Sequence, residues 1–321
     1  MISIIVPVYN AENWLEKTLE SIVNQTLFDD IEVVLVNDGS LDKSGMIIDE
    51  YIKKYDNIIG IHIENQGVSN ARNVGINICH GEFITFIDAD DYVDVDFVEN
   101  LYKSMDENCD IVCGGFIAEY HDKSIKRCPD KEYIFENEKI YFEFLKGDVF
   151  DPNVTDKLFR RNVVGEEKFD LSIAIAEDKL FLFHCLKRVK KIKFLPVANY
   201  HYVMNDLSAC RKDFTLKKYH SVYVADKISE EIKCLYPEYK NYAESMAIDV
   251  KCRVYGEIYR CKAKNSFNKE FLELKRNIKN FGIIEKYRYS NRKHFFAFLV
   301  ARIHPALYCF LKNEMKLQYK N

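Results

Sequence analysis

The sequence predicts an α/β protein, with an open, mostly parallel sheet covered by helices on both faces and a helical C-terminal region behind it. Three observations lead to this prediction. Short runs rich in Ile and Val alternate with segments of helical period over residues 2–113, as in buried parallel strands joined by helices. Polar or acidic residues follow four of these runs, and apolar residues recur at helical intervals from Asp213 onward.

Five apolar runs in the first 113 residues predict strands. Between the first two runs, Leu15, Leu19 and Ile22 recur at helical spacing, and Asn10 with Glu12 supplies a cap and a first-turn acid. This order forms a βαβ unit, and a succession of such units predicts an open parallel sheet. The predicted strands are Ile2–Val8, Ile31–Val36, Ile58–Ile63, Glu82–Ile87 and Asp110–Cys113.

The pattern becomes mixed after residue 113 and helical near the end of the chain. The mixed part is predicted to hold strands at Lys193–Val197 and Tyr200–Val203 and helices at Glu136–Leu145 and Glu177–Leu186. We therefore expect one domain over residues 1–205, with halves at 1–113 and 114–205, and a helical region over residues 206–321.

The composition suits a globular protein of 321 residues, of which 48% are hydrophobic. The formal net charge is −4, but residues 281–321 hold eight Lys and Arg against two acids, so the tail is basic. The ten cysteines form no C-x-x-C pair and the chain shows no signal-peptide pattern at its start, which favours a cytoplasmic protein. No apolar run is long enough to cross a bilayer, and no nucleic-acid partner is expected.

Polar segments follow four neighbouring strands of the predicted sheet: "PVYN", "NDGS" (Asn37–Ser40), "NQG" and "DADD" (Asp88–Asp91). Ligands of such sheets bind at the carboxyl ends of the strands, so these segments predict one crevice. The twelve glycines allow neither G-x-G-x-x-G nor a P-loop. A phosphate site lined by carboxylates needs a cation such as Mg²⁺ or Mn²⁺. On an extended chain Asp88 and Asp90 point the same way, while Asp91 points opposite.

Each of these residues also has a purely structural interpretation. Acidic triplets after strands are often solvated or cap the next helix, and Asp38 could be a turn or N-cap residue. Arg72 could be an ordinary helix residue near a solvated surface, or could stabilise a pyrophosphate or an acidic neighbour. A lone His on a strand, such as His201, is more often packed or surface-exposed than a metal ligand.

Four segments in order resemble the motifs of glycosyltransferase family 2, which are inverting enzymes with the GT-A fold. They are "SIIVPVYNAENWLEKTLESIVNQT", "EVVLVNDGSLDKS", "NQGVSNARNVGI" and "GEFITFIDADDYV". The resemblance covers residues 1–115 and resumes at Thr155–Arg161 and Ala176–Phe181. It implies that residues 1–113 are a nucleotide-binding half and residues 114–205 an acceptor half.

The resemblance also implies roles for individual residues. Pro7, Tyr9 and Asp38 would hold the nucleotide base, with Asp38 accepting from the imide N–H of uracil, which implies a UDP-sugar donor. Arg72, Asp88 and Ala89 would lie along the nucleotide. Asp90, with Asp88 and with His201 as a third ligand, would bind Mn²⁺ or Mg²⁺ at the diphosphate.

Inversion requires a base that removes the proton of the attacking hydroxyl. The resemblance assigns this role to Asp178, whose place at a helix N-terminus predicts an ionised carboxylate, with Glu177 in support or in the exchanged role. Simple N-terminal helix charge is the structural alternative. The family often carries an Arg-containing segment that Val203 and Met204 replace here, so either Arg211 supplies the positive charge or that charge is missing.

Together these features predict a metal-dependent, inverting hexosyl- or N-acetylhexosaminyltransferase of cell-surface glycan synthesis, such as capsule or exopolysaccharide. Its expected acceptor is an oligosaccharide or a lipid-linked saccharide, and its expected place is the cytoplasm, at the inner face of the membrane if residues 292–312 bind lipid. The alternatives are a non-catalytic nucleotide- or sugar-binding module and, less favoured, a glycoside hydrolase.

Overall fold

The computed structural model describes residues 1–204 and 213–310, which form two compact units. The first unit comprises Met1–Ile140, Asp151–Ser172 and the chain from Glu177 to the end of the last strand. The second comprises Tyr141–Phe150, Ile173–Ala176 and the C-terminal helices. Arg211, the predicted replacement for the family's basic segment, lies outside the described residues.

A single sheet forms the centre of the first unit, with the strand order β3-β2-β1-β4-β9-β6-β10-β5. β7 pairs with β6, and β8 with β10. The strands are β1 (Ile2–Val8), β2 (Ile31–Asp38), β3 (Ile58–Ile63), β4 (Phe83–Phe86), β5 (Tyr92–Val93), β6 (Ile111–Glu119), β7 (Ser124–Arg127), β8 (Tyr133–Glu136), β9 (Lys157–Arg160) and β10 (Lys191–Val203). β1 to β4 are mutually parallel, as predicted. β9, β5, β7 and β8 pair antiparallel, so the whole sheet is mixed.

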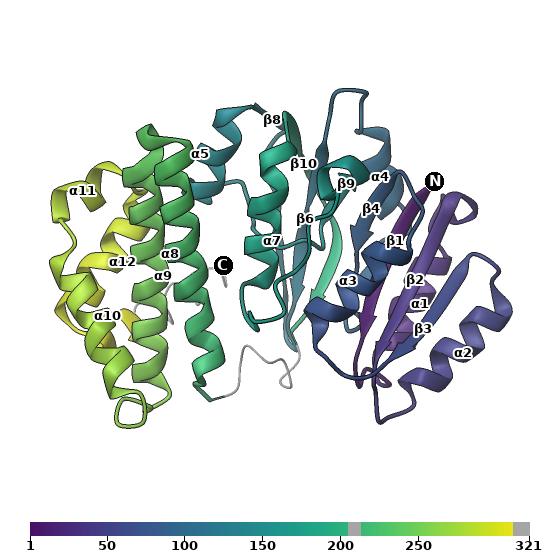
Figure 1. Cartoon of the computed structure of the whole chain (residues 1–321), viewed down its shortest axis with the longest axis horizontal. Helices are drawn as coiled ribbons and strands as arrows, with labels where there is room; N and C mark the ends of the chain where they lie inside the picture. The colour runs from purple at the N-terminus through teal and green to yellow at the C-terminus, as the bar shows by residue number, and fades with distance from the viewer. Residues whose placement is uncertain (205–212, 311–321) are drawn as a thin grey trace. The chain divides into compact units, whose positions relative to one another are not determined.

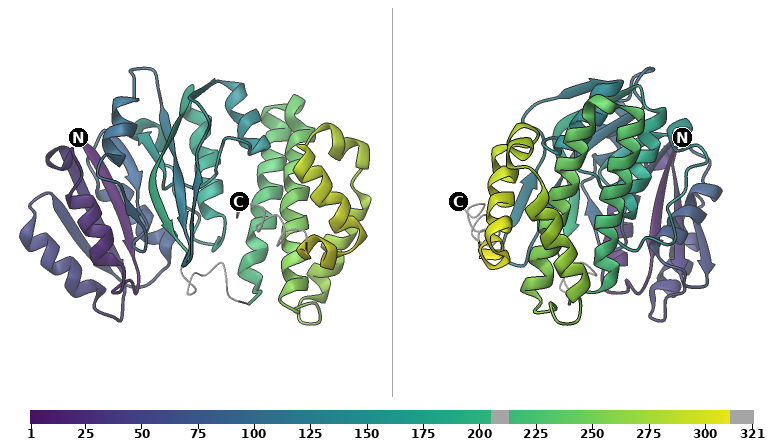
Figure 2. Two further views of the ribbon diagram at one scale, coloured as in Figure 1. Left: turned by 180° about the vertical axis from the view of Figure 1, so that it is seen from behind. Right: turned by 60° about the vertical axis from the view of Figure 1, so that its left-hand side comes forward.

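Helices cover both faces of the parallel strands, which confirms the predicted α/β class (Figures 1 and 2). Alternate residues of β1 show this: Ile4 and Val6 belong to the core that includes Leu15 and Leu19, whereas Ile5 faces the helix on the other side. That helix approaches so closely that a Cβ on its Gly75 would lie 2.3 Å from the Ile5 side chain. The helices of this unit are α1 (Leu15–Val23), α2 (Ser44–Lys54), α3 (Val68–Ile78), α4 (Phe97–Lys103), α6 (Arg161–Val164) and α7 (Glu177–Cys185), with 3-10 turns η1 (Phe28–Asp30) and η2 (Leu186–Arg188).

The structure corrects two predicted strand boundaries. The two short strands expected near residue 200 are one strand, β10, with irregular register around Ala198. The strand expected to reach Ile87 ends at Phe86, and the acidic segment forms a turn in which the Asp91 N–H donates to the Asp88 carbonyl at 3.1 Å. The acids therefore follow the strand in a turn, where extended-chain alternation no longer fixes their directions.

The second unit is helical, as predicted for the C-terminal part of the chain. α8 and α9 lie side by side (Figures 1 and 2), and Ile258, Leu274 and Phe298 join three of the helices in one core. The elements are most of α5 (Glu138–Lys146), α8 (Leu216–Leu235), η3 (Pro237–Tyr239), α9 (Lys240–Arg260), α10 (Asn268–Asn280), α11 (Ile283–Arg288) and α12 (Arg292–Ile303). Among the described residues, no helix has the length and apolar character needed to span a bilayer.

Candidate active site

Hydrogen bonds between loops fix the carboxyl ends of β1 and β2. The Asn10 N–H donates to Ser40 Oγ at 3.0 Å, and the Leu41 N–H donates to Asn10 Oδ1 at 2.8 Å. Asn10 has φ of 48°, a left-handed conformation that Asn tolerates better than most residues. The two loops therefore hold each other at the edge of the sheet where the sequence predicted a binding crevice.

Asp38 ends β2 and is buried, with 2% of its surface exposed. Its two carboxylate oxygens accept from the backbone N–H groups of Gln66 and Gly67, each at 2.8 Å, which fixes the start of α3. Pro7 is buried in β1 next to β2, whereas Tyr9, just beyond β1, is 51% exposed. The structure thus places Pro7, Tyr9 and Asp38 at two neighbouring strand ends, and their contact with a nucleotide base stays a prediction.

Arg72 lies buried between two carboxylates that are distant in the sequence. Its Nη2 is 2.8 Å from Asp88 Oδ1, and its Nη1 is 3.2 Å from Glu177 Oε1. The guanidinium also lies 5.3 Å from the centre of the Phe169 ring. Burial lowers the pKa of Arg72, but Asp88, Glu177 and Asp178 together raise it more, so the group stays charged. Arg72 is therefore no solvent-facing helix residue, and the second sequence interpretation, an acidic neighbour, is confirmed.

One hydrogen-bond donor of Arg72 has no partner among the described residues. Its Nε is buried and has no hydrogen-bond partner within the described ranges 1–204 and 213–310. Unpaired buried donors are uncommon because each loses its hydration without compensation. A polar ligand beside this guanidinium would supply the missing acceptor.

Glu177 and Asp178 begin α7 directly after a strained residue. Ala176 has φ of 72°, a left-handed conformation that costs a residue with a Cβ on the order of 1 kcal/mol. Burial and the neighbouring Asp178 raise the pKa of Glu177 to about 7, although Arg72 opposes the shift. Burial also raises the pKa of Asp178, against the effect of Arg72 and of the Lys179 N–H, which donates to Asp178 Oδ1 at 2.7 Å.

The raised pKa of Asp178 differs from the expectation that its place at the helix N-terminus keeps this carboxylate ionised. The helix start and Arg72 do favour the carboxylate, but loss of hydration is the larger effect for both acids. Perturbed acids of this kind are typical of catalytic sites, where a base with a pKa near the working pH is most effective.

The Asp88–Asp91 turn is held by residues that the sequence did not single out. Asp91 is buried, and its carboxylate accepts from the Tyr200 O–H at 2.6 Å and from the Val203 N–H at 2.8 Å. Thr18 Oγ1 lies 2.6 Å from the Asp91 carbonyl oxygen. Burial, together with the charges of Asp88 and Asp90, raises the pKa of Asp91. Asp91 therefore anchors the turn to β10, while Asp88 and Asp90 stay on its half-exposed side.

The carboxylate oxygens of Asp88 and Asp90 are the kind of ligand that a hard divalent cation prefers. Two carboxylates in one turn leave the remaining coordination sites to phosphate oxygens and water, which is how Mg²⁺ is usually bound. Within the part of the chain that the structure describes, no group of three His, Cys, Asp or Glu side chains is arranged as a metal site. A cation here would therefore rely on its substrate for further ligands.

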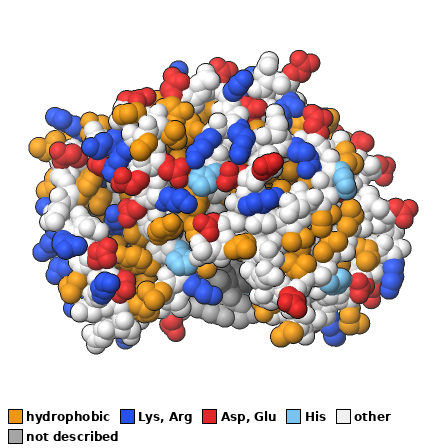
Figure 3. Space-filling view, viewed as in Figure 1, with side chains coloured by type: hydrophobic (Ala, Val, Ile, Leu, Met, Phe, Trp, Pro, Cys, Tyr) orange, Lys and Arg blue, Asp and Glu red, His pale blue; other side chains and the backbone are white. Residues whose placement is uncertain are grey.

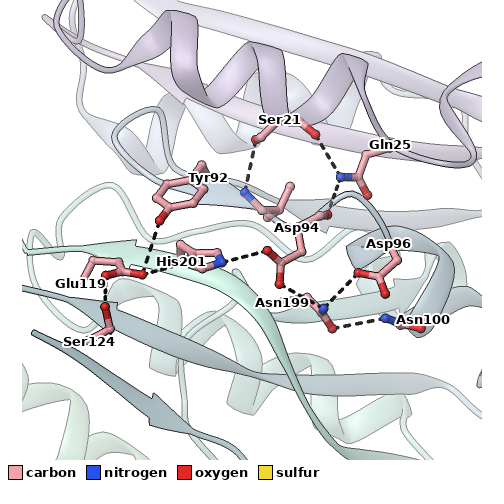
Figure 4. A network of polar contacts seen from close by, with 11 residues as sticks. Ser21, Gln25, Tyr92, Asp94, Asp96, Asn100, Glu119, Ser124, Asn199 and His201 are labelled. Carbon is pink, nitrogen blue, oxygen red and sulfur yellow. Dashed lines mark hydrogen bonds and ion pairs between the residues drawn. The ribbon is translucent and has the colours of Figure 1, made fainter.

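The structure places His201 apart from Asp88 and Asp90, which corrects the expected third metal ligand. His201 Nδ1 lies 2.8 Å from Glu119 Oε1 and Nε2 lies 3.0 Å from Asp94 Oδ1, so both ring nitrogens face other carboxylates (Figure 4). The ring stacks on Tyr92 at 4.2 Å between centroids. The physical reason is strand alternation: Tyr200 points to the Asp91 side of β10, so the next residue points away from it.

The sequence of the chain is similar to those of known glycosyltransferases. The family model "Glycosyl transferase family 2" matches residues 3–166 of the chain. The glycosyltransferase GlyA of Streptococcus pneumoniae is 34% identical over 259 residues, which are 75% of this chain and 36% of that protein. The poly(ribitol-phosphate) beta-glucosyltransferase of Bacillus spizizenii is 33% identical over 212 residues, 63% of this chain and 32% of that protein. The chain thus spans about a third of the length of these two relatives.

A solved structure is similar over nearly the whole chain. The crystal structure of residues 1–349 of Staphylococcus aureus TarS in complex with UDP-GlcNAc superposes with a TM-score of 0.71 at 20% identity, covering 99% of this chain and 92% of that one. At this identity the likeness concerns the fold, and it confirms the predicted GT-A architecture followed by helices.

Proposed function

The chain belongs to glycosyl transferase family 2, and from this premise we propose that it transfers a sugar from a UDP-sugar to a hydroxyl group of a saccharide, with inversion at the anomeric carbon. One observation supports the proposal most directly: buried Arg72 joins Asp88, which follows β4, to Glu177 at the start of α7. Asp88, predicted to lie near the sugar donor, and Glu177, next to the predicted base, therefore contact the same guanidinium group.

Inversion by direct displacement needs one base and no covalent intermediate with the enzyme. We assign Asp178 as the group that takes the proton of the acceptor hydroxyl, because the family resemblance places the base at this position and the neighbouring Glu177 is already engaged by Arg72. Glu177 is a positioning residue: its contact with Arg72 ties the start of α7 to the Asp88 turn. Burial raises the pKa of both acids, which makes each a stronger base once ionised.

For the donor, we propose that Tyr9 and Asp38 contact the uracil and that Asp88 and Asp90 hold Mn²⁺ or Mg²⁺ at the diphosphate. A bound cation would neutralise the charge of the departing UDP. Arg72 lies beside Asp88 with one donor unpaired, so it can hydrogen-bond an oxygen of the same ligand.

For the transferred sugar and the acceptor, the relatives suggest two classes. One relative is a poly(ribitol-phosphate) beta-glucosyltransferase, and another is a poly(ribitol-phosphate) beta-N-acetylglucosaminyltransferase. We propose glucose or N-acetylglucosamine as the transferred sugar and a cell-surface polymer or its lipid-linked precursor as the acceptor.

The tail adds a proposed contact with the inner face of the membrane. Phe298 of α12 is fully buried in the helical core, but Phe296 is 53% and Ile303 72% exposed. Basic residues, including Arg292 and Lys293, accompany these exposed side chains, and this combination suits anionic lipid headgroups. Phe296→Ser with Ile303→Ser should abolish co-sedimentation with anionic vesicles at low salt. Equal sedimentation of the variant and the wild type would contradict the contact.

The transfer proposal is tested by measuring UDP release from UDP-glucose and UDP-GlcNAc in the presence of saccharide acceptors. Asp178→Asn should lower turnover about 100-fold or more while UDP binding stays nearly unchanged. Glu166→Gln is a matched control, because Glu166 is exposed and lies outside the site. If the wild type released no UDP from either donor, or if Asp178→Asn kept a wild-type rate, the assignment would be refuted.

A further inference from the structure

The second unit contains a cavity of about 190 Å³ whose lining includes none of the residues assigned to the transfer reaction. It is lined by α5 and the residues after it, by α9, and by the end of α11, the start of α12 and the segment between them, and all the lining residues belong to this unit. Asp88, Asp90, Glu177 and Asp178 belong to the first unit. The cavity is smaller than the ~300–1,000 Å³ pockets that hold drug-sized ligands, and its size suits one monosaccharide unit.

Three aromatic rings form one side of this cavity. Phe142 meets Tyr242 edge-on at 4.9 Å between centroids, and Tyr242 meets Tyr289 edge-on at 5.1 Å. The Tyr242 and Tyr289 hydroxyls have no hydrogen-bond partner among the described residues. Such rings offer an apolar surface and a polar tip together, which matches the C–H face and the hydroxyl groups of a pyranose.

Charged side chains of both signs complete the lining. Lys146 and Arg288 are cationic, while Asp148 and Asp249 are anionic. Both carboxylates are paired, Asp148 with Lys146 at 3.1 Å and Asp249 with Lys286 at 2.7 Å. Arg288 is exposed and forms no ion pair or hydrogen bond with any residue that the structure describes. Sugar hydroxyls donate and accept at once, so one sugar unit can accept from Arg288 and donate to the two carboxylates. An apolar ligand would leave these charges without hydration.

A buried lysine orients one of these carboxylates. Lys286 is 0% exposed, and its Nζ lies 2.7 Å from Asp249 Oδ1 and 2.8 Å from Ser245 Oγ. Asp249 Oδ2 lies 3.2 Å from His294 Nδ1. Buried ion pairs contribute little net stability because both charges lose their hydration. The arrangement is better explained as holding Asp249 in one position at the edge of the cavity.

We propose that this cavity is a second saccharide site, which binds one neutral sugar unit of the acceptor by stacking on the aromatic rings and by hydrogen bonds to Arg288, Asp249 and the tyrosine hydroxyls. The identity of the sugar as part of the acceptor rests on the proposed transferase function. Binding of the sugar itself does not, because it needs no donor and no turnover.

The test is ligand-observed NMR on the full chain with methyl β-D-glucopyranoside and N-acetylglucosamine, without any UDP-sugar. We expect at least one of them to bind, with excess UDP leaving the binding unchanged. Arg288→Ala should weaken binding about tenfold, as expected for loss of a charged hydrogen-bond donor. Tyr242→Phe, which removes only a hydroxyl, should also weaken it.

Arg292→Ala is the matched control, because Arg292 is also an exposed arginine but does not line the cavity. Failure of both sugars to bind, or equal binding by wild type and Arg288→Ala, would overturn the proposal. Because UDP release is measured separately, sugar binding without turnover would refute the transferase function alone, and turnover without this binding would refute the second site alone.

Discussion

Replacing Glu177 with glutamine should stabilise the protein at alkaline pH. The Glu177 side chain is 12% exposed, and burial with the neighbouring Asp178 raises its pKa from 4.5 to about 7. A carboxyl group whose pKa is higher in the folded than in the unfolded protein favours unfolding once the pH is high enough to ionise it. Glutamine keeps the shape and cannot ionise, so Glu177→Gln removes this penalty.

The size and the pH range of the effect follow from the two pKa values. Below pH 4.5 the group is protonated in both states, so the penalty is absent. As the pH rises from 4.5 to about 7, Glu177 ionises in the unfolded chain before it does so in the folded protein, and the stability of the wild type falls. At about 1.4 kcal/mol per pH unit, the full penalty above pH 7 is about 3 kcal/mol.

Urea unfolding of the wild type and Glu177→Gln at pH 5 and pH 8 measures this difference. We expect the variant to be more stable by about 3 kcal/mol at pH 8 and by less than about 1 kcal/mol at pH 5. Glu166→Gln makes the same chemical change at an exposed position and should have no such pH dependence. A gain of equal size at both pH values, or no gain at pH 8, would show that ionisation of Glu177 is not the cause.

Three further predictions concern the turn, the base pocket and the cation. Tyr200→Phe removes the O–H that donates to buried Asp91 at 2.6 Å and should lower the unfolding free energy by about 1–3 kcal/mol in urea titrations; an unchanged value would mean that another donor replaces it. Asp38→Ala should reduce the preference for UDP over GDP in calorimetry, and equal binding of both nucleotides by the wild type would contradict uracil recognition. Asp90→Ala, or excess EDTA with the wild type, should abolish turnover with little change in thermal stability, whereas full activity in EDTA would exclude a required cation.

Much of the fold could be predicted from the sequence because the responsible signals are local. The Ile- and Val-rich runs of β1 to β3 are continuous, and the helices between them have clear apolar periods. The short strand β9 was not predicted, since a four-residue segment depends on its partners β4 and β6, which are distant in the sequence. The short strand β7, which pairs with the preceding β6, was not predicted either. β10 was predicted as two pieces separated by Ala198 and Asn199, yet the strand continues between them through an irregular register.

The residues of the candidate site also include some that the sequence could predict and some that it could not. Asp88, Asp90 and Asp178 could be found by their place after a strand or at the start of a helix. The sequence left the environment of Arg72 open, because its two partners lie 16 and 105 positions away in the chain. Thr18 and Tyr200 carried no signal, since each looks like an ordinary residue of a helix or strand and its role depends on which atom faces the turn.

The electrostatic balance of the site gives a reason why carboxylates gather where an anionic donor is proposed to bind. One arginine, Arg72, faces Asp88 and Glu177 directly, and Asp178 follows Glu177 in the chain. Burial and nearby carboxylates raise the pKa values of Asp91 and Glu177, so both acids hold their protons more strongly than usual, and their ionisation at higher pH adds negative charge that Arg72 alone does not compensate. A cation at Asp88 and Asp90 would relieve this excess and at the same time attract a diphosphate. We therefore expect the affinity for a divalent cation to rise with pH as these acids ionise, and calorimetric Mn²⁺ titrations at pH 6 and pH 8 should show tighter binding at pH 8; equal affinity would mean that Asp91 and Glu177 do not contribute to the field at the turn.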